Sequence, residues 1–314
     1  MWRYIAARLA AVVPMTLVLT VAVFWLIHGL LGDPAVLMLG RDADPVTVAR
    51  LRHQLGFDRP LYAQYGDWLG HALRGDLGRS LRNREPVAEA LRQRLLPTGE
   101  LTLLAMAFAL AAALGLGTVA AVRYGGAADF AVSGVCIVGV TLPNFMLGIT
   151  LILIFALSLR WLPSGGFVSP FGDLAGNLRD MVLPTLTLSF AYIGILSLVL
   201  KSSLRAALQT AYVQTARAKG MFGRRVLVRH ALRNALIPLV SVFGIEVGRL
   251  FGGAVVTEAI FSLPGVGQLL VESILGRDFP VIQAVVVFMA LGVLLVNLLV
   301  DLSYAWLDPR VSYD

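Results

Sequence analysis

The sequence predicts an all-α membrane protein with about six transmembrane helices, and its composition, its apolar runs and its charge distribution support this. Of the 314 residues, 58% are hydrophobic and 14% are charged, and the mean hydropathy is +0.79. Globular domains carry roughly 25% charged residues, so a soluble core is excluded. The net charge of +7 lies mainly on segments that flank the apolar runs, and membrane topology explains it without nucleic-acid binding.

Five apolar runs contain no charged residue, and each is long enough to cross a bilayer, which takes about 20 helical residues. A sixth run, Ala235–Val256, is interrupted by Glu246 and Arg249. The first run exceeds the roughly 7–15 residues of a signal-peptide core, and no convincing cleavage site follows it, so we expect it to be retained. The five uncharged runs are Ala10–Leu31, Leu101–Val122, Ala131–Leu159, Met181–Leu200 and Val281–Val300.

Basic residues predict the orientation of the chain. Between Lys201 and Ala235 there are eight Lys or Arg and no Asp or Glu, which places this loop in the cytosol under the positive-inside rule. Arg3 and Arg8 precede the first run without an acidic neighbour, which places the N-terminus on the same side. Six spans return the chain to that side, so we expect both termini to be cytosolic.

This topology divides the chain into four parts. The largest part contains five of the six predicted helices together with the cytosolic loop, 201–235. The four parts are the cytosolic N-terminus with the first helix (1–31), an external helical subdomain (32–97), the transmembrane domain (98–306) and a cytosolic C-terminal tail (307–314).

The external subdomain contains signals for short helices. Asp44 and Pro45 are a suitable N-cap and first-turn pair, and Gly56 lies where a C-cap is expected. The stretches PLYAQYGDWLGHAL and PVAEALRQRLL each open with proline and carry apolar residues at helical spacing. This subdomain either covers the transmembrane part as a cap or docks a partner.

The cytosolic loop has the pattern of two short amphipathic helices joined by a glycine. Val213 to Lys219 can form one helix that ends at Gly220, and Arg224 to Asn234 a second that enters the membrane at Pro238. On composition alone, such a basic pair either receives a cytosolic partner or holds anionic lipid headgroups.

The sequence of this loop also resembles that of a known family. TARAKG followed by RRVLVRHALRNALIP is similar to the coupling loop of permease subunits in bacterial ABC importers of the dipeptide, oligopeptide and nickel group. Gln214 and Thr215 stand where the wider importer pattern has Glu and Ala. Further similar stretches cover nearly the whole chain, namely GDPA, LGFDRPLYAQYGDWL, GDLGRS, TLPNF, GGAVVTEAIFSLPGVGQLL, RDFPVIQ and DLSYAWLDPRV.

The resemblance implies a transport subunit of type I importer architecture in the bacterial inner membrane, without catalytic, cofactor-binding or metal-binding residues. It implies a second homologous permease, an external substrate-binding protein and two ATPase subunits that bind ATP and Mg, beside membrane lipids. In agreement, the phosphate-binding pattern G-x-x-x-x-G-K-[ST] does not occur in the sequence. The residues implied in coupling to the ATPase are Gln214, Thr215, Ala216, Arg217, Ala218, Lys219, Gly220, Met221, Arg224 and Arg225.

Three polar residues in the apolar runs are candidates for the translocation path: Asn144, Glu246 and Arg249. A charge near the middle of a membrane costs about 2.5–3.5 kcal/mol, and the i, i+3 spacing of Glu246 and Arg249 lets both face the same side. These two residues can pair within the helix, line the path or contact the second permease. A path that bears both signs would suit a zwitterionic peptide.

Peptide is therefore the first expectation for the cargo, carried by alternating access. Nickel is the alternative, disfavoured because only His28 of the four histidines lies in a span and metal transit favours imidazole or thiol ligands. Glutathione and opines also remain possible. A channel or secondary transporter acting alone should show a selectivity ring, an inverted repeat or coupling-ion carboxylates, and a membrane enzyme a nucleophile with a base or a metal cluster; none is evident in the sequence.

Overall fold

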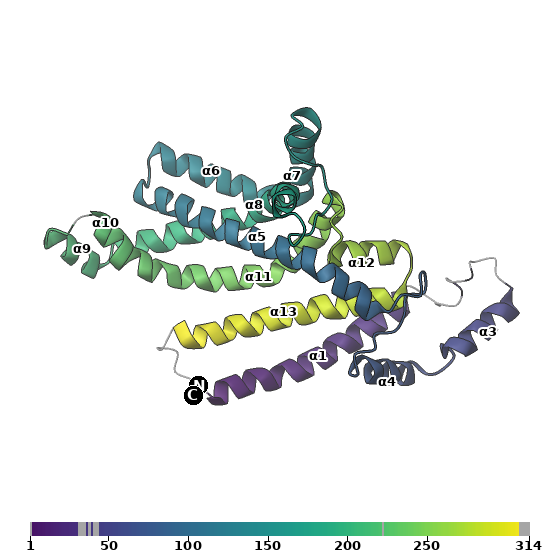
Figure 1. The fold of residues 1–314 in the computed structure, drawn as a ribbon. Coiled ribbons are helices and arrows are strands. Elements are labelled where there is room, and N and C mark those ends of the chain that lie inside the picture. The colour runs from purple at the N-terminus through teal and green to yellow at the C-terminus, as the bar shows by residue number, and fades with distance from the viewer. Residues whose placement is uncertain (1, 31–35, 37–38, 40–43, 222, 308–314) are drawn as a thin grey trace. The chain divides into compact units, whose positions relative to one another are not determined.

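The computed structural model describes residues 2–30, 36, 39, 44–221 and 223–307, and helices form most of this part of the chain (Figure 1). The GDPA segment at 32–35 and the predicted tail from 308 onward lie outside the described residues. The elements are α1 (Trp2–Leu30), α3 (Pro45–Leu55), α4 (Leu61–Ala72), α5 (Val87–Val122), α6 (Ala127–Thr141), α7 (Asn144–Leu151), η1 (Ile152–Ser158), α8 (Leu174–Leu208), α9 (Ala211–Ala218), α10 (Gly223–Val226), η2 (Leu227–Leu232), α11 (Arg233–Phe261), α12 (Val266–Leu275) and α13 (Phe279–Leu307).

These helices belong to two compact units, each described here by itself. The first unit comprises Met1–Thr98 and Pro264–Leu294, and the second comprises Gly99–Leu263 and Leu295–Asp314. α5 and α13 contribute residues to both units. The division of the chain into four parts by membrane topology stays a prediction.

Five helical segments of the described chain are long and apolar enough to cross a membrane, and two bent helix pairs would raise the number to seven. Each of the five contains all or most of one predicted span. They are Ala10–Ile27, Val87–Val122, Leu174–Leu208, Gly223–Leu250 and Phe279–Val300. The predicted all-α membrane architecture is thereby confirmed.

The prediction of one continuous span at Ala131–Leu159 is wrong. Ala127–Thr141 and Asn144–Ser158 are two helices with a bend of 106° between them. The break falls at Leu142 and Pro143, both of which have extended backbone angles. A residue before proline is disfavoured in the helical conformation because the proline ring crowds its backbone. An apolar run alone does not show such a break.

Local signals predict the first two external helices correctly. The side chain of Asp44 accepts a hydrogen bond from the backbone N–H of Thr47 (3.2 Å) at the start of α3, and Gly56 ends this helix with a left-handed φ of +72°. α4 begins directly after Pro60. α3 therefore starts and stops where its capping residues predict, and α4 starts directly after the predicted proline.

The third predicted external helix is instead the beginning of α5. This helix continues through Pro97 and ends at Val122. Proline lacks an N–H and leaves a carbonyl in the preceding turn without its usual partner, but hydroxyl groups satisfy such carbonyls in membrane helices. At Pro97 that carbonyl belongs to Gln93, and the Thr98 hydroxyl donates to the adjacent carbonyl of Arg94 (3.3 Å).

Within the first unit, side-chain contacts hold the segment that is predicted to be external against the long helices. The Tyr65 ring on α4 lies edge-on to Phe24 of α1, with 5.5 Å between ring centroids, and its hydroxyl is 2.9 Å from that of Thr20. Farther along, the buried Ser80 hydroxyl donates to the Asp278 carboxylate (2.5 Å) just before α13. This segment is thus held at two places.

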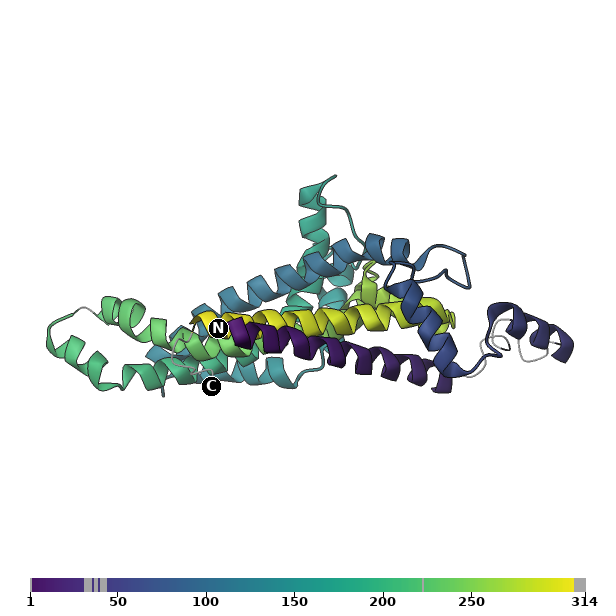
Figure 2. The same cartoon turned by 90° about the horizontal axis from the view of Figure 1, so that it is seen from below.

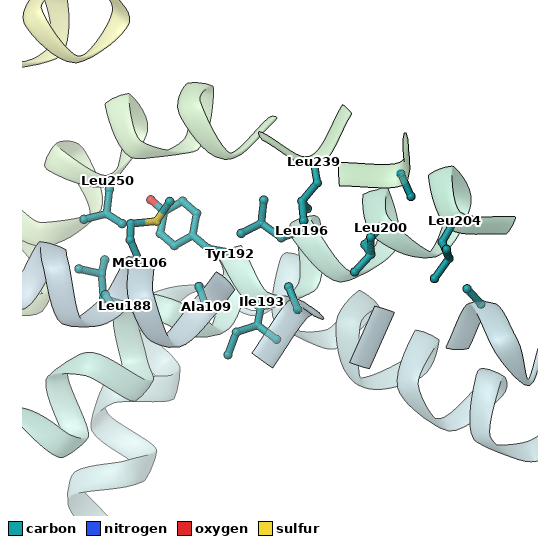
Figure 3. Packing of buried hydrophobic residues seen from close by; sticks show 14 of the residues in the cluster. Met106, Ala109, Leu188, Tyr192, Ile193, Leu196, Leu200, Leu204, Leu239 and Leu250 are labelled. Carbon is teal, nitrogen blue, oxygen red and sulfur yellow. The ribbon is translucent and has the colours of Figure 1, made fainter. Parts of the chain in front are cut away.

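α8 is the central helix of the second unit and packs against α6, α7 and α11. Figure 3 shows its buried side chains, including Leu196 and Leu200, among the residues of the hydrophobic core. Gly194 permits the close approach of α6, because a Cβ at this position would lie 2.5 Å from the carbonyl oxygen of Cys136. Real Cβ atoms do not come so near a backbone oxygen, so this contact requires glycine.

Gly194→Ala is expected to lower the stability of the purified chain by about 1–3 kcal/mol, the usual cost of overpacking. Gly134→Ala is the matched control on α6, because nothing lies within 4 Å of a Cβ there. Alanine is also the better helix former, so the control should be neutral or slightly stabilising. Thermal unfolding in detergent measures both, and equal midpoints would contradict the close approach of α6 and α8.

Candidate functional site

The basic loop, residues 201–235, forms the predicted pair of helices. α9 and α10 lie side by side at the end of the second unit where α8 ends, and η2 continues α10 into α11 (Figures 1 and 2). The turn contains Gly220 with a left-handed φ of +78°. The N–H of Met221 donates to the Ala216 carbonyl (3.3 Å) and closes the end of α9. Glycine adopts this conformation without the steric cost that a side chain brings.

One face of the basic loop is buried in the second unit. Val213 and Ala216 of α9 belong to its hydrophobic core, together with Val226 on the returning limb. The Asn234 amide donates to the Tyr212 hydroxyl (2.6 Å), which links α9 to the start of α11. A short helix held in this way can transmit a rigid-body displacement to the long helices that carry it.

The opposite face of the basic loop is exposed. Of the residues predicted to couple to an ATPase, Ala216 is buried and Met221 partly buried, so these two hold the loop in place. The side chain of Arg217 lies outside the described residues. The predicted residues that are exposed are Gln214, Thr215, Ala218, Lys219, Gly220, Arg224 and Arg225.

The two charged residues of α11 form an ion pair. Nη1 of Arg249 lies 3.1 Å from Oε1 of Glu246. The Glu246 side chain is 5% exposed, whereas that of Arg249 is 69% exposed. The buried carboxylate therefore has a cationic partner, while most of the Arg249 side chain is exposed. A role of this pair in a translocation path stays a prediction.

The structure brings Asn144, the third candidate for the path, near the same face of α11. A Cβ at Gly253 would lie 3.7 Å from Nδ2 of Asn144 and 3.5 Å from the hydroxyl oxygen of Tyr192. Gly253 follows Arg249 by four residues and Glu246 by seven, and this spacing places all three on one helix face. α7, α8 and α11 thus bring polar groups to one region of the second unit, which we call the polar cluster.

Sequence reasoning missed Tyr192 as a member of the polar cluster. Its side chain belongs to the buried core of α8, and Figure 3 shows its hydroxyl on the side of Leu250 and Met106. A signal was present, because a tyrosine inside the apolar run Met181–Leu200 brings a hydroxyl that needs a partner when buried. The run itself does not reveal which helix Tyr192 faces.

A second ion pair of the second unit joins two helices. Asp129 of α6 pairs with Lys201 of α8. Among the residues that the structure describes, no three His, Cys, Asp or Glu side chains are arranged to hold a metal ion. The candidate site therefore consists of an exposed basic hairpin and a membrane-embedded polar cluster.

Comparison with known protein families assigns the chain to one of them. The family described as "Binding-protein-dependent transport system inner membrane component" matches residues 113–313, which is more than half of the chain. The chain belongs to this family. The N-terminal component of the same type of transport system matches residues 1–102 of the permease, so the two matches cover nearly all of it.

Relatives and a solved structure support the assignment. The permease is 39% identical to the glutathione transport system permease protein GsiC of Salmonella choleraesuis (strain SC-B67) over 313 residues, which is 100% of both chains. It is 40% identical over 314 residues, again 100% of both, to a putative peptide transport system permease protein of Brucella suis biovar 1 (strain 1330). A crystal structure of an amino acid ABC transporter with histidines matches with a TM-score of 0.54 and 14% identity, over 69% of the permease and 94% of that chain. At this identity the likeness concerns the fold alone.

The predicted resemblance is confirmed: the chain is a permease subunit of an ABC importer of the peptide and oligopeptide family. It is a transport subunit rather than the ATPase of such a system. It is a multi-pass protein of the inner membrane and works with other ABC transporter components.

Proposed function

We propose that the permease forms half of a translocation path for di- or oligopeptides and opens it by alternating access. Its partners are a second homologous permease, two ATPase subunits that bind ATP and Mg, and an external substrate-binding protein. Both termini and the basic loop lie in the cytosol, since the loop concentrates basic residues without acidic ones. The external subdomain, 32–97, docks the binding protein.

The observation that carries this proposal is the geometry of the basic loop. An ATPase can move a permease only through a surface that is both exposed and mechanically fixed to the membrane helices. α9 has an exposed face with Gln214 and Thr215 and a buried face with Val213 and Ala216, and the exposed Lys219 follows directly after it. Closure of the ATPase dimer displaces this hairpin as a body, and α8 and α11 follow it.

The cargo is argued from the polar cluster and the relatives. Arg249 presents an exposed guanidinium beside the buried Glu246 carboxylate, and a guanidinium matches the carboxylate of a peptide C-terminus in a bidentate geometry. Relatives named as peptide and glutathione permeases support a peptide-like cargo. Glutathione is the second candidate, because it is itself a small peptide that bears free carboxylates.

Uptake assays in a host that lacks its own peptide and glutathione importers test the cargo. Cells that express the permease with its partners would be given labelled dipeptide, glutathione or nickel. We expect ATP-dependent uptake of the dipeptide. Uptake of glutathione alone would move the assignment to the second candidate, and uptake of nickel alone would contradict a peptide-like cargo.

Arg249→Gln is expected to reduce peptide uptake about tenfold, which corresponds to the loss of one charge-assisted hydrogen bond of about 1.5 kcal/mol. The control is Arg123→Gln, which removes the same charge from an exposed position after the end of α5. Initial uptake rates should be compared at equal amounts of assembled importer. If Arg249→Gln transported as fast as Arg123→Gln, the ion pair would be structural only.

A further inference from the structure

A groove lies along the end of α8 in the second unit, at the start of the basic loop and apart from the polar cluster and from α9. It encloses about 460 Å³. Apart from Tyr124, its lining residues recur every three or four positions on α8 and therefore share one face of that helix. The lining residues are Tyr124, Leu198, Lys201, Ser202, Arg205, Ala206 and Gln209.

The two cations in this groove differ in their surroundings. Lys201 pairs with the buried carboxylate of Asp129 and donates to the Ser133 hydroxyl (2.8 Å), so its charge is compensated. The guanidinium carbon of Arg205 lies 3.1 Å from the ring centroid of Tyr124. Within the described part of the chain, Arg205 forms no ion pair with a carboxylate. The groove therefore holds one fixed, uncompensated positive charge.

The groove extends across the end of a membrane span. Leu198 lies inside the apolar run that ends at Leu200, whereas Gln209 is the residue that caps α8. Gln209 is eleven positions after Leu198, and a helix rises about 1.5 Å per residue, so the groove covers about 16 Å along the axis. Its apolar end therefore lies within the predicted span, and its polar end lies beyond the end of that span.

We propose that this groove binds one anionic phospholipid, with the phosphate at Arg205 and the start of an acyl chain at Leu198. A guanidinium offers parallel N–H donors that match two phosphate oxygens. The Tyr124 ring holds these donors in place, and the exposed Ser202 and Gln209 side chains supply further polar groups. Basic pockets at the cytosolic ends of membrane helices are suited to anionic headgroups. A soluble phosphate has no apolar part that could contact Leu198 at the apolar end of the groove.

The test is native mass spectrometry of the assembled importer, released from membranes of phosphatidylglycerol or of phosphatidylcholine. We expect one tightly held phosphatidylglycerol per permease and no equivalent phosphatidylcholine. Arg205→Gln should weaken this binding about tenfold, whereas Arg123→Gln should leave it unchanged. Equal losses of bound phosphatidylglycerol in the two variants would contradict the proposed site. They would indicate diffuse attraction between the protein and an anionic surface instead.

Ala206→Trp keeps both cations and fills the groove at an exposed position. It tests the groove independently of Arg205, so the test still holds if Arg205→Gln has a folding defect. We expect Ala206→Trp to lose the lipid as well. Full retention of the lipid by Ala206→Trp would overturn the proposed location. Displacement of the lipid by millimolar inorganic phosphate would show a site for free phosphate and would overturn the assignment to a phospholipid.

Discussion

Gly220→Asp is expected to lower ATP-driven uptake by at least about 30-fold while the permease still inserts in the membrane. Gly220 has a φ of +78°, and a residue with a Cβ pays about 1–2 kcal/mol for a left-handed conformation. The new carboxylate also introduces an opposite charge into a basic surface that receives the ATPase. Loss of one interface hot spot costs about 2 kcal/mol or more, which corresponds to about 30-fold in affinity.

Gly223→Asp is the matched control for the Gly220 variant. It adds the same side chain and charge three residues later, at the start of α10, and nothing lies within 4 Å of a Cβ there. Because it carries the same charge without the left-handed backbone, we expect it to retain more of the uptake than Gly220→Asp does. The measurement is uptake per permease molecule, quantified by immunoblot of isolated membranes. Normal uptake by Gly220→Asp at normal abundance would contradict the coupling role of this turn.

Lys201→Met is expected to destabilise the permease, because removal of one partner of an ion pair leaves the other charge without compensation. The Asp129 side chain is 5% exposed and that of Lys201 20%. Without the ammonium, Asp129 keeps the Gly125 N–H (3.0 Å) and the Ser133 hydroxyl (3.1 Å) as donors but has no cation. The packing of α6 against α8 should therefore be weaker. We expect a lower unfolding temperature and a smaller amount of permease in the membrane.

The double variant Asp129→Asn with Lys201→Met distinguishes the cost of an uncompensated charge from the effect of the substitution on the surrounding packing. It removes both charges and retains similar side-chain volumes, so it should recover most of the stability that Lys201→Met loses. Thermal unfolding of both variants in detergent measures this recovery. A single variant as stable as the unmodified permease would show that the pair contributes little to the packing of α6 against α8.

Sequence predictions succeed here where the determining signals are local. The caps at Asp44 and Gly56 and the turn at Gly220 depend on residues within one or two helical turns, and each is found where predicted. Pro143 is an equally local signal of the break between α6 and α7. The apolar run continues on both sides of it, however, and hydropathy alone does not show whether a run forms one straight helix or two helices with a bend.

Contacts between distant segments could not be predicted. Glu246 and Arg249 pair because their i, i+3 spacing is local. The pair of Asp129 and Lys201 joins different helices 72 positions apart, and nothing in either segment identifies the other. The place of Tyr192 beside α11 depends in the same way on tertiary packing.

Site-directed cross-linking from the turn after α9 tests the coupling role of the basic loop most directly. Cys136 is the only native cysteine, so Cys136→Ala with Lys219→Cys places one thiol on the exposed face of the hairpin. Tyr62→Cys, on an exposed position of α4, is the control. In the assembled importer, a photoreactive label at position 219 should attach to an ATPase subunit, and a label at position 62 should not. Attachment of the ATPase to position 62, or to neither position while the importer stays assembled, would contradict the account.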